Sequence, residues 1–184
     1  MANTDAAFGL RAIGKVGQNN DNQGLSEYSI AASATAIYQG DPVEMLATGT
    51  IGVAAATDVL LGSLNGVNYT DATNQKPRWA NHLAASNTAT DIVGFISDDP
   101  YERFVIQSAG TVTQTNIGNC ADIVYAAGAT PNYVSKVEAS GTMANGTAQL
   151  KIIGLAKNPD NAFGLNADVV VTINEHFLKQ TAGI

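Results

Sequence analysis

Two adjacent carboxylates, Asp98 and Asp99, are the residues of this chain that come nearest to a catalytic pair. Neighbouring carboxylates can bind a cation or share acid and base roles in hydrolysis. Asp-Asp-Pro is also ordinary turn chemistry, because an Asp side chain bonds the backbone two residues on and Pro100 cannot donate a ladder hydrogen bond. No His or Cys is near them in the sequence. We therefore interpret them as the turn of a central hairpin over residues 95–110.

The other reactive side chains are few and widely separated. His82 and His176 stand in different segments without metal-ligand spacing, so a core or partner-contact role is expected for each. Cys120 is the single cysteine, which excludes an intrachain disulfide and favours a small buried residue over a nucleophile. Neither a Gly-x-Ser-x-Gly elbow nor a Walker phosphate loop occurs. We therefore predict no enzyme activity, no metal and no cofactor.

Short β-strands must position these side chains, because apolar and polar residues alternate and turn sequences arrive about every ten residues. The clearest strands are expected at residues 150–155 and 168–178, joined by a turn at residues 158–161. Residues 111–120 allow a single helical turn. The pattern predicts an all-β fold, a single compact antiparallel β-barrel or jelly-roll-like sandwich formed by residues 27–184.

The first 26 residues differ from the rest. Residues 1–26 lack sustained periodicity and end in a polar run over residues 17–24, which predicts an extended N-terminal arm. Two interpretations stay open: the arm docks into a groove on a neighbouring molecule, or it folds back over its own core. Within this arm Phe8, Leu10 and Ile13 are apolar islands beside Arg11, a pattern that suits docking into a groove.

Segment 70–90 is rich in loop signals and contains Trp79 between Arg78 and His82. Trp and Arg are enriched at binding hot spots, so Trp79 is a candidate contact with a partner. Alternatively, Trp79 closes one end of the barrel, or it forms a platform for a sugar ring. The sequence does not separate these interpretations.

Composition indicates a protein whose surface is partly covered in its working state. Charged residues make up 14% of the chain, against about 25% in typical soluble domains. Weakly charged surface of this kind favours an oligomer or a larger assembly. The net charge of −7 argues against direct nucleic-acid binding, and no apolar run approaches the ~20 residues that span a membrane. The first residues lack a signal-peptide pattern, so synthesis in a cytoplasm is expected.

Several short pieces, taken in order, carry a family resemblance along nearly the whole chain. They are Ala7-Phe8-Gly9-Leu10-Arg11, Gly40-Asp41-Pro42-Val43, residues 45–51, residues 66–71, Asp98-Asp99-Pro100, residues 154–156 with 158–161, and Ile173-Asn174-Glu175-His176-Phe177. Together they resemble a family of tailed-bacteriophage head proteins described as virion structural or capsid cement (decoration) proteins. The chain departs from the pattern at Ala6 and Ala12, where relatives have prolines.

The resemblance implies a structural role and no catalytic residues. Cement proteins of similar phages sit as trimers on the outer capsid surface and bridge neighbouring capsomers. The resemblance therefore implies the virion as location, with the major capsid protein and two further copies of the chain as partners in a homotrimer. On this interpretation we expect capsid or partner contacts at Phe8, Leu10, Arg11, Ile13 and Trp79, and a subunit interface at Tyr101, Glu102 and Arg103.

Two other classes of function make different expectations. A glycan-binding module on the virion surface would use Tyr69, Trp79 and Tyr101 as platforms and would bind sugars. A hydrolase would need carboxylates such as Asp98 and Asp99 to converge in one cleft.

Overall fold

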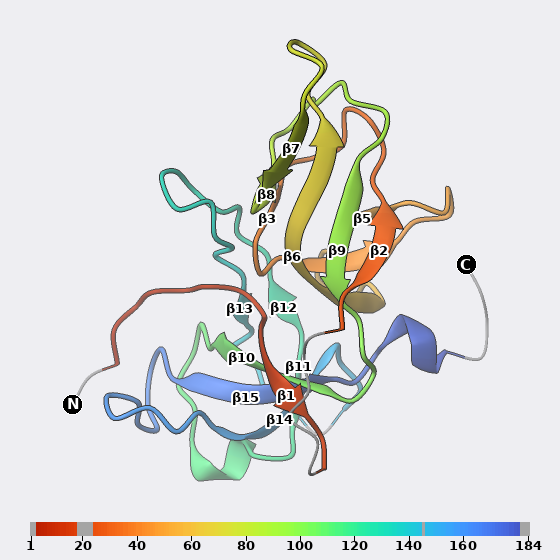
Figure 1. Cartoon of the computed structure of the whole chain (residues 1–184). Coiled ribbons are helices and arrows are strands. Elements are labelled where there is room, and N and C mark those ends of the chain that lie inside the picture. The colour runs from red at the N-terminus through yellow and green to blue at the C-terminus, as the bar shows by residue number, and fades with distance from the viewer. Residues whose placement is uncertain (1–2, 18–23, 145, 181–184) are drawn as a thin grey trace.

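The computed structural model describes residues 3–17, 24–144 and 146–180, and β-strands dominate these ranges. The predicted all-β fold is confirmed. Figure 1 shows two groups of strands, one above the other, that correspond to two antiparallel sheets. Two 3-10 turns accompany them, η1 (Gln114–Asn116) and η2 (Phe177–Lys179). The first is the single turn that residues 111–120 allow. In the described ranges no helix is long and apolar enough to cross a membrane.

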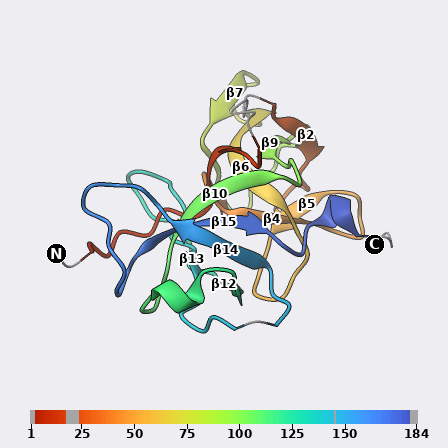
Figure 2. The same cartoon turned by 90° about the horizontal axis from the view of Figure 1, so that it is seen from below.

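The lower group is a five-stranded sheet with strand order β1-β10-β15-β14-β11. Figure 2 shows β10, β15 and β14 side by side from below. The bounds are β1 (Arg11–Lys15), β10 (Glu102–Gln107), β11 (Cys120–Ala121), β14 (Leu150–Leu155) and β15 (Asp168–Ile173), with the separate pair β12 (Ile123–Val124) and β13 (Glu138–Ala139) beyond β11. A bridge from Ala139 to Ser108 links β13 back to the end of β10. The five-stranded sheet and the β12–β13 pair therefore curve around one hydrophobic core.

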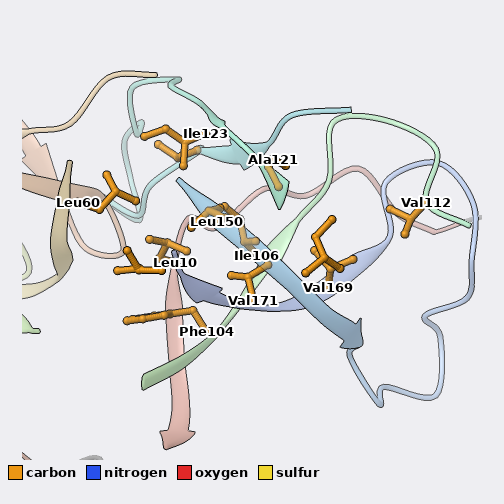
Figure 3. Packing of buried hydrophobic residues seen from close by; sticks show 14 of the residues in the cluster. Leu10, Leu60, Phe104, Ile106, Val112, Ala121, Ile123, Leu150, Val169 and Val171 are labelled. Carbon is orange, nitrogen blue, oxygen red and sulfur yellow. The ribbon is translucent and has the colours of Figure 1, made fainter. Parts of the chain in front are cut away.

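Alternating residues of these strands fill one hydrophobic core (Figure 3). The alternation follows from the strand geometry, which sends successive side chains to opposite faces. Each of these aliphatic or aromatic side chains contributes about 1.5–3 kcal/mol by leaving water. Side chains that are at most 1% exposed include Leu10, Phe104, Ile106, Leu150, Ile152, Val169 and Val171.

The upper group is a six-stranded sheet with strand order β2-β9-β6-β4-β5 and with β7 beside β6. The bounds are β2 (Ser26–Ser29), β4 (Pro42–Met45), β5 (Ile51–Val53), β6 (Leu60–Thr70), β7 (Pro77–Ala80) and β9 (Val93–Ser97), with the separate pair β3 (Ile37–Tyr38) and β8 (His82–Leu83). Ile30, directly after β2, bridges to Ile51 of β5. The outer strands thus approach each other, and the sheet curls like a small barrel around a second hydrophobic core.

The chain builds the whole six-stranded sheet from one contiguous stretch, residues 26–97, placed between β1 and β10. The predicted hairpin over residues 95–110 was therefore wrong. Strand β9 pairs with β2 and β6, whereas β10 pairs with β1 and β15 in the other sheet. Alternation along the sequence identifies each strand correctly but carries no information about its partner.

The N-terminal residues are extended and lie against the chain itself. Strand β1 pairs with β10, and Leu10 is 1% exposed in the lower core. Before it, Gln107 holds the backbone of the segment, donating to the Thr4 carbonyl at 2.9 Å and accepting from the Ala6 amide at 2.8 Å. A boundary after residue 26 therefore does not separate an arm from a domain, because β1 is a strand of the lower sheet. Residues 18–23 of the predicted polar run lie outside the described ranges.

Candidate interaction surfaces

The turn at residues 98–100 is where the chain passes from the upper to the lower sheet. The Asp98 carboxylate accepts two hydrogen bonds, at 2.8 Å from the Ser26 hydroxyl and at 2.6 Å from the Tyr28 hydroxyl. Burial raises the pKa of Tyr28 to about 12, and its hydrogen bond to Asp98 adds to the shift. Both oxygens of Asp98 are therefore engaged in tying β2 to the turn.

Asp99 is also held structurally. Its carboxylate accepts from the Tyr101 amide at 2.8 Å and lies 2.8 Å from Lys15 Nζ of β1. The hydrogen bond from Lys15 lowers the pKa of Asp99, and burial opposes this only in part. The Glu102 amide closes the turn by donating to the Asp99 carbonyl at 3.0 Å. The predicted turn is confirmed. Asp98 connects it to β2 of the upper sheet, and Asp99 connects it to β1 of the lower sheet.

A histidine that is remote in the sequence belongs to the same junction. His176 is fully buried, and its Nδ1 accepts from the Leu178 amide at 3.1 Å. Burial lowers the pKa of His176 to about 4, helped by the Lys179 charge and opposed by Asp98 and Asp99. In the part of the chain that the structure describes, no group of three or more His, Cys, Asp or Glu could hold a metal ion. The junction therefore offers a buried neutral imidazole, with its carboxylates already bonded.

The predicted subunit interface does not present all three of its residues. Tyr101 is 64% exposed and is available to a neighbour. Glu102 is 1% exposed, because its Oε1 accepts from the Gly14 amide at 3.1 Å, at the bulge of β1. Arg103 is half-buried, and its Nε lies buried without a hydrogen-bond partner. Strand alternation explains the difference, since Glu102 points to the inner side of β10 and cannot reach another subunit.

A second junction joins the N-terminal segment to the upper sheet. The Leu10 amide donates to the Gly40 carbonyl at 2.8 Å, and the Ser63 hydroxyl donates to the Leu10 carbonyl at 2.6 Å. Gly9 has a φ of +73°, and a Cβ there would collide with the Gly40 carbonyl and with Ser135. Only glycine fits this close approach in a left-handed conformation. Two pieces of the family resemblance, at residues 7–11 and 40–43, therefore meet in space.

Asp41 is the buried charge of this second junction. It is fully buried, and its Oδ2 accepts from the Tyr38 amide at 2.8 Å, while its Oδ1 has no hydrogen-bond partner. Burial raises the pKa of Asp41 to about 6, and the nearby Ser135 side chain and the Tyr38 amide oppose this shift in part. The junctions between the sheets thus contain buried titratable side chains, Asp41 in one, and His176 with Glu102 in the other.

The predicted contact residues near the N-terminus divide between core and surface. Leu10 is in the core, so it cannot contact a partner while this fold is intact. Ile13 is 41% exposed at the β1 bulge. Phe8 and Arg11 line a groove of about 430 Å³, where the Arg11 guanidinium carbon lies 4.6 Å from the centre of the Phe8 ring. The groove lining also includes Leu25, directly before β2, and Ser63, Asn65 and Ser97 of the upper sheet.

Trp79 lies far more exposed than a residue that closes a barrel would be. It is 57% exposed on β7 and packs against Phe95, with ring centres 4.9 Å apart. The three aromatic platforms expected for a glycan-binding module are not brought together. Tyr69 is 8% exposed within the upper core, and Tyr101 lies at the junction between the sheets.

The remaining reactive side chains, His82 and Cys120, lie in strands β8 and β11. The His82 ring stacks on Tyr133 with centres 3.9 Å apart and an interplanar angle of 5°. Burial lowers the pKa of His82, with a smaller effect from the Arg78 charge. Cys120 is half-buried on β11, not fully buried as the sequence suggested.

One exposed apolar surface was not predicted from the sequence. In the loop between β14 and β15, Phe163 is 43% and Leu165 is 57% exposed. Asn3 fixes this loop with three hydrogen bonds, donating to the Ala162 and Leu165 carbonyls at 2.9 and 2.8 Å and accepting from the Ala162 amide at 3.0 Å. Gly164 and Val112 exchange two more backbone bonds, both 2.9 Å. We name residues 161–166 the braced loop. The signal in the sequence was two apolar residues inside the turn-like stretch Asn-Ala-Phe-Gly-Leu-Asn.

Comparisons with known proteins give no relative from which a function could be transferred. No protein-family model matches the sequence, and neither a curated protein nor a solved structure matches the chain.

Proposed function

We propose that this chain is a structural protein of a tailed-phage virion that binds the outside of the assembled capsid as a homotrimer and cements neighbouring capsomers. The order of the sequence pieces that resemble capsid cement proteins supports the proposal. Their places in the fold support it further, because residues 7–11 meet residues 40–43, and residues 98–100 meet residues 173–177. These four pieces form the two junctions that hold the sheets together, as expected for a scaffold and not for a catalytic cleft.

The braced loop is the observation that carries the proposal. Ordered apolar side chains in water are unfavourable for an isolated molecule, and exposed apolar patches mark contact sites. Phe163 and Leu165 are exposed although Asn3 and Gly164 fix the backbone around them. A loop that is already ordered loses little conformational entropy when it binds, so more of its contact energy appears as affinity. The braced loop is therefore suited to dock on the major capsid protein.

A capsid cement protein stabilises the shell by binding to it, according to mass action. A molecule that binds only the assembled shell stabilises that shell by its binding free energy, which grows with the logarithm of free concentration over Kd. Many copies at equivalent positions add their contributions. The low content of charged residues, 14%, fits a surface that is largely covered in the working state.

The test is the occupancy of purified capsids. The native chain is expected at hundreds of copies per particle, with a solution mass of three chains. The double variant F163S/L165S is expected to reduce occupancy at least tenfold while its thermal unfolding stays within a few degrees of the native value, because the changed side chains are exposed. The matched control is L178S, since Leu178 is 51% exposed on η2, on the other side of the molecule in Figures 1 and 2.

Asn3 supplies a second variant that leaves the apolar side chains in place. Asn3→Ala removes the three hydrogen bonds that brace the loop, so it is expected to weaken occupancy less than the double variant does. Thr4→Ala is its control, because the neighbouring Thr4 accepts a hydrogen bond from Gln107 through its backbone carbonyl, which the substitution keeps. A monomeric protein that is absent from particles, or equal occupancy of the native chain and F163S/L165S, would contradict the proposal.

A further inference from the structure

Trp79 forms a rigid aromatic platform on the outer face of the six-stranded sheet. Its ring covers Gly66, where a Cβ would lie 2.6 Å from Trp79 Cζ2, and it also packs against Phe95. The missing side chain at Gly66 therefore creates the space in which the indole lies. One side of the ring packs on Gly66 and Phe95, and 57% of the Trp79 side-chain and backbone surface is exposed to solvent.

Two exposed amide side chains, Asn68 and Asn65, come from β6 on either side of Gly66 in the sequence. Asn68 pairs directly with Trp79 across the strands and is exposed, so the two side chains share one face of the sheet. Asn65 is exposed at the bulge of β6 beside Gly66, and its Oδ1 lies 3.4 Å from Gln39 Nε2. These amides can donate and accept hydrogen bonds at once, which suits hydroxyl groups.

The platform continues into the groove that the N-terminal segment lines. Ser97 and Ser63 are register partners, and both line the groove. Phe95 is two residues before Ser97 on β9, so their side chains lie on the same face. A strip of surface thus runs from the Trp79 ring over Phe95 to the groove and Arg11. The groove volume of about 430 Å³ suits a small molecule, and the exposed Trp79 ring extends the surface beyond the groove.

The chemistry of this strip identifies its ligand class. An exposed flat ring binds the C–H face of a pyranose, and neighbouring amides and hydroxyls bind its hydroxyl groups. The strip has one cation, Arg11, so it is unsuited to the phosphates of a nucleic acid, which need several Lys or Arg side chains. We propose that the Trp79 platform and the adjoining groove bind an oligosaccharide, with Trp79 stacking on one sugar ring and with Asn68 and Asn65 bonding its hydroxyls.

The experiment uses the isolated native chain, without capsids, so its outcome is separate from that of the cement proposal. The protein is applied to an array of neutral and uronic-acid oligosaccharides, and the strongest binder is titrated calorimetrically. Trp79→Ala is expected to weaken binding at least tenfold, and Asn68→Ala about threefold or more. Tyr101→Ala is the matched control, since Tyr101 is 64% exposed and is not among the residues that line the groove, and it is expected to bind like the native chain.

A variant that keeps the indole tests the platform itself. Gly66→Ala puts a methyl group where the ring lies, so the ring must move and binding is expected to weaken several-fold while Trp79 is still present. Circular dichroism melts establish that each variant is folded. Absence of binding to every glycan on the array overturns the inference, and so does a glycan that Trp79→Ala binds as tightly as the native chain does.

Discussion

Asp41 and His176, which are buried at the sheet junctions and have large pKa shifts, make a quantitative prediction about stability and pH. Asp41 has an ordinary pKa of 3.8 and a folded-state pKa of about 6. The folded chain therefore binds this proton more tightly than the unfolded chain does. The free energy of unfolding rises as the pH falls from about 6 towards 3.8, by about 3 kcal/mol in all.

His176 acts in the opposite direction over nearly the same range. Its ordinary pKa is 6.5 and its folded-state pKa is about 4, because burial disfavours the imidazolium. The unfolded chain binds this proton more tightly, so the free energy of unfolding falls as the pH falls from 6.5 towards 4, again by about 3 kcal/mol. In the native chain the two contributions nearly cancel between pH 4 and 6.5.

Single variants should uncover each contribution. Asp41→Asn keeps the shape but removes the titration, so the variant should lose about 3 kcal/mol relative to the native chain between pH 6.5 and 4. His176→Asn keeps an acceptor for the Leu178 amide, and this variant should gain about 3 kcal/mol relative to the native chain over the same range. The double variant should recover the native pH profile, although its overall stability differs.

Urea unfolding at pH 4.0, 5.0, 6.0 and 7.0 measures these profiles by linear extrapolation. The differences between variants matter, because all other titrating groups contribute equally to each profile. Profiles that run parallel in the native chain and both single variants would refute the reasoning, as would an Asp41→Asn variant that becomes more stable on acidification.

Two further predictions concern the N-terminal segment. Gly9→Ala should destabilise the fold by about 2 kcal/mol or more in urea unfolding, since a Cβ at φ +73° collides with neighbouring atoms. Gly146→Ala, where a Cβ meets open space, should be near neutral, and similar losses in both would count against the close approach. Leu10→Ala should cost about 2–5 kcal/mol as a core truncation, and Ile13→Ala should cost less than 1 because Ile13 is 41% exposed. Equal effects of the last pair would contradict the placement of Leu10 in the core.

Strand positions in this chain could be predicted more closely than strand partners. The predicted strand at residues 168–178 is too long, because β15 ends at Ile173 and Phe177–Lys179 form the 3-10 turn η2. The bounds of β14 match the predicted strand at residues 150–155, because six residues of mostly apolar and β-branched character stand between clear turns. The pairing of β9 and β10 was predicted incorrectly because a short turn connects two strands whether or not they pair. Only the hydrophobic faces of other, distant strands decide which sheet each one joins.

Surface sites were harder to predict because exposure depends on long-range contacts. Glu102 has the sequence of a solvent-facing strand residue, yet the bulge of β1 leaves the Gly14 amide in need of an acceptor, and Glu102 supplies it. His176 comes near the turn at residues 98–100 because the chain returns there after β15. Leu10 was predicted as a partner contact and lies in the core, since the segment that contains it folds back.

The placement of residues 26–97 between β1 and β10 has a consequence for the order in which the chain can fold. Strands β1 and β10 are far apart in sequence, so pairing them first would close a long, entropically costly loop. Once the intervening strands have paired, Ser26 and Ile96 lie on neighbouring strands, and the two ends of the long segment are brought together. Formation of the upper sheet therefore shortens the effective loop between β1 and β10 and lowers the entropic cost of pairing them. During synthesis the upper sheet can form before β14 and β15 have left the ribosome.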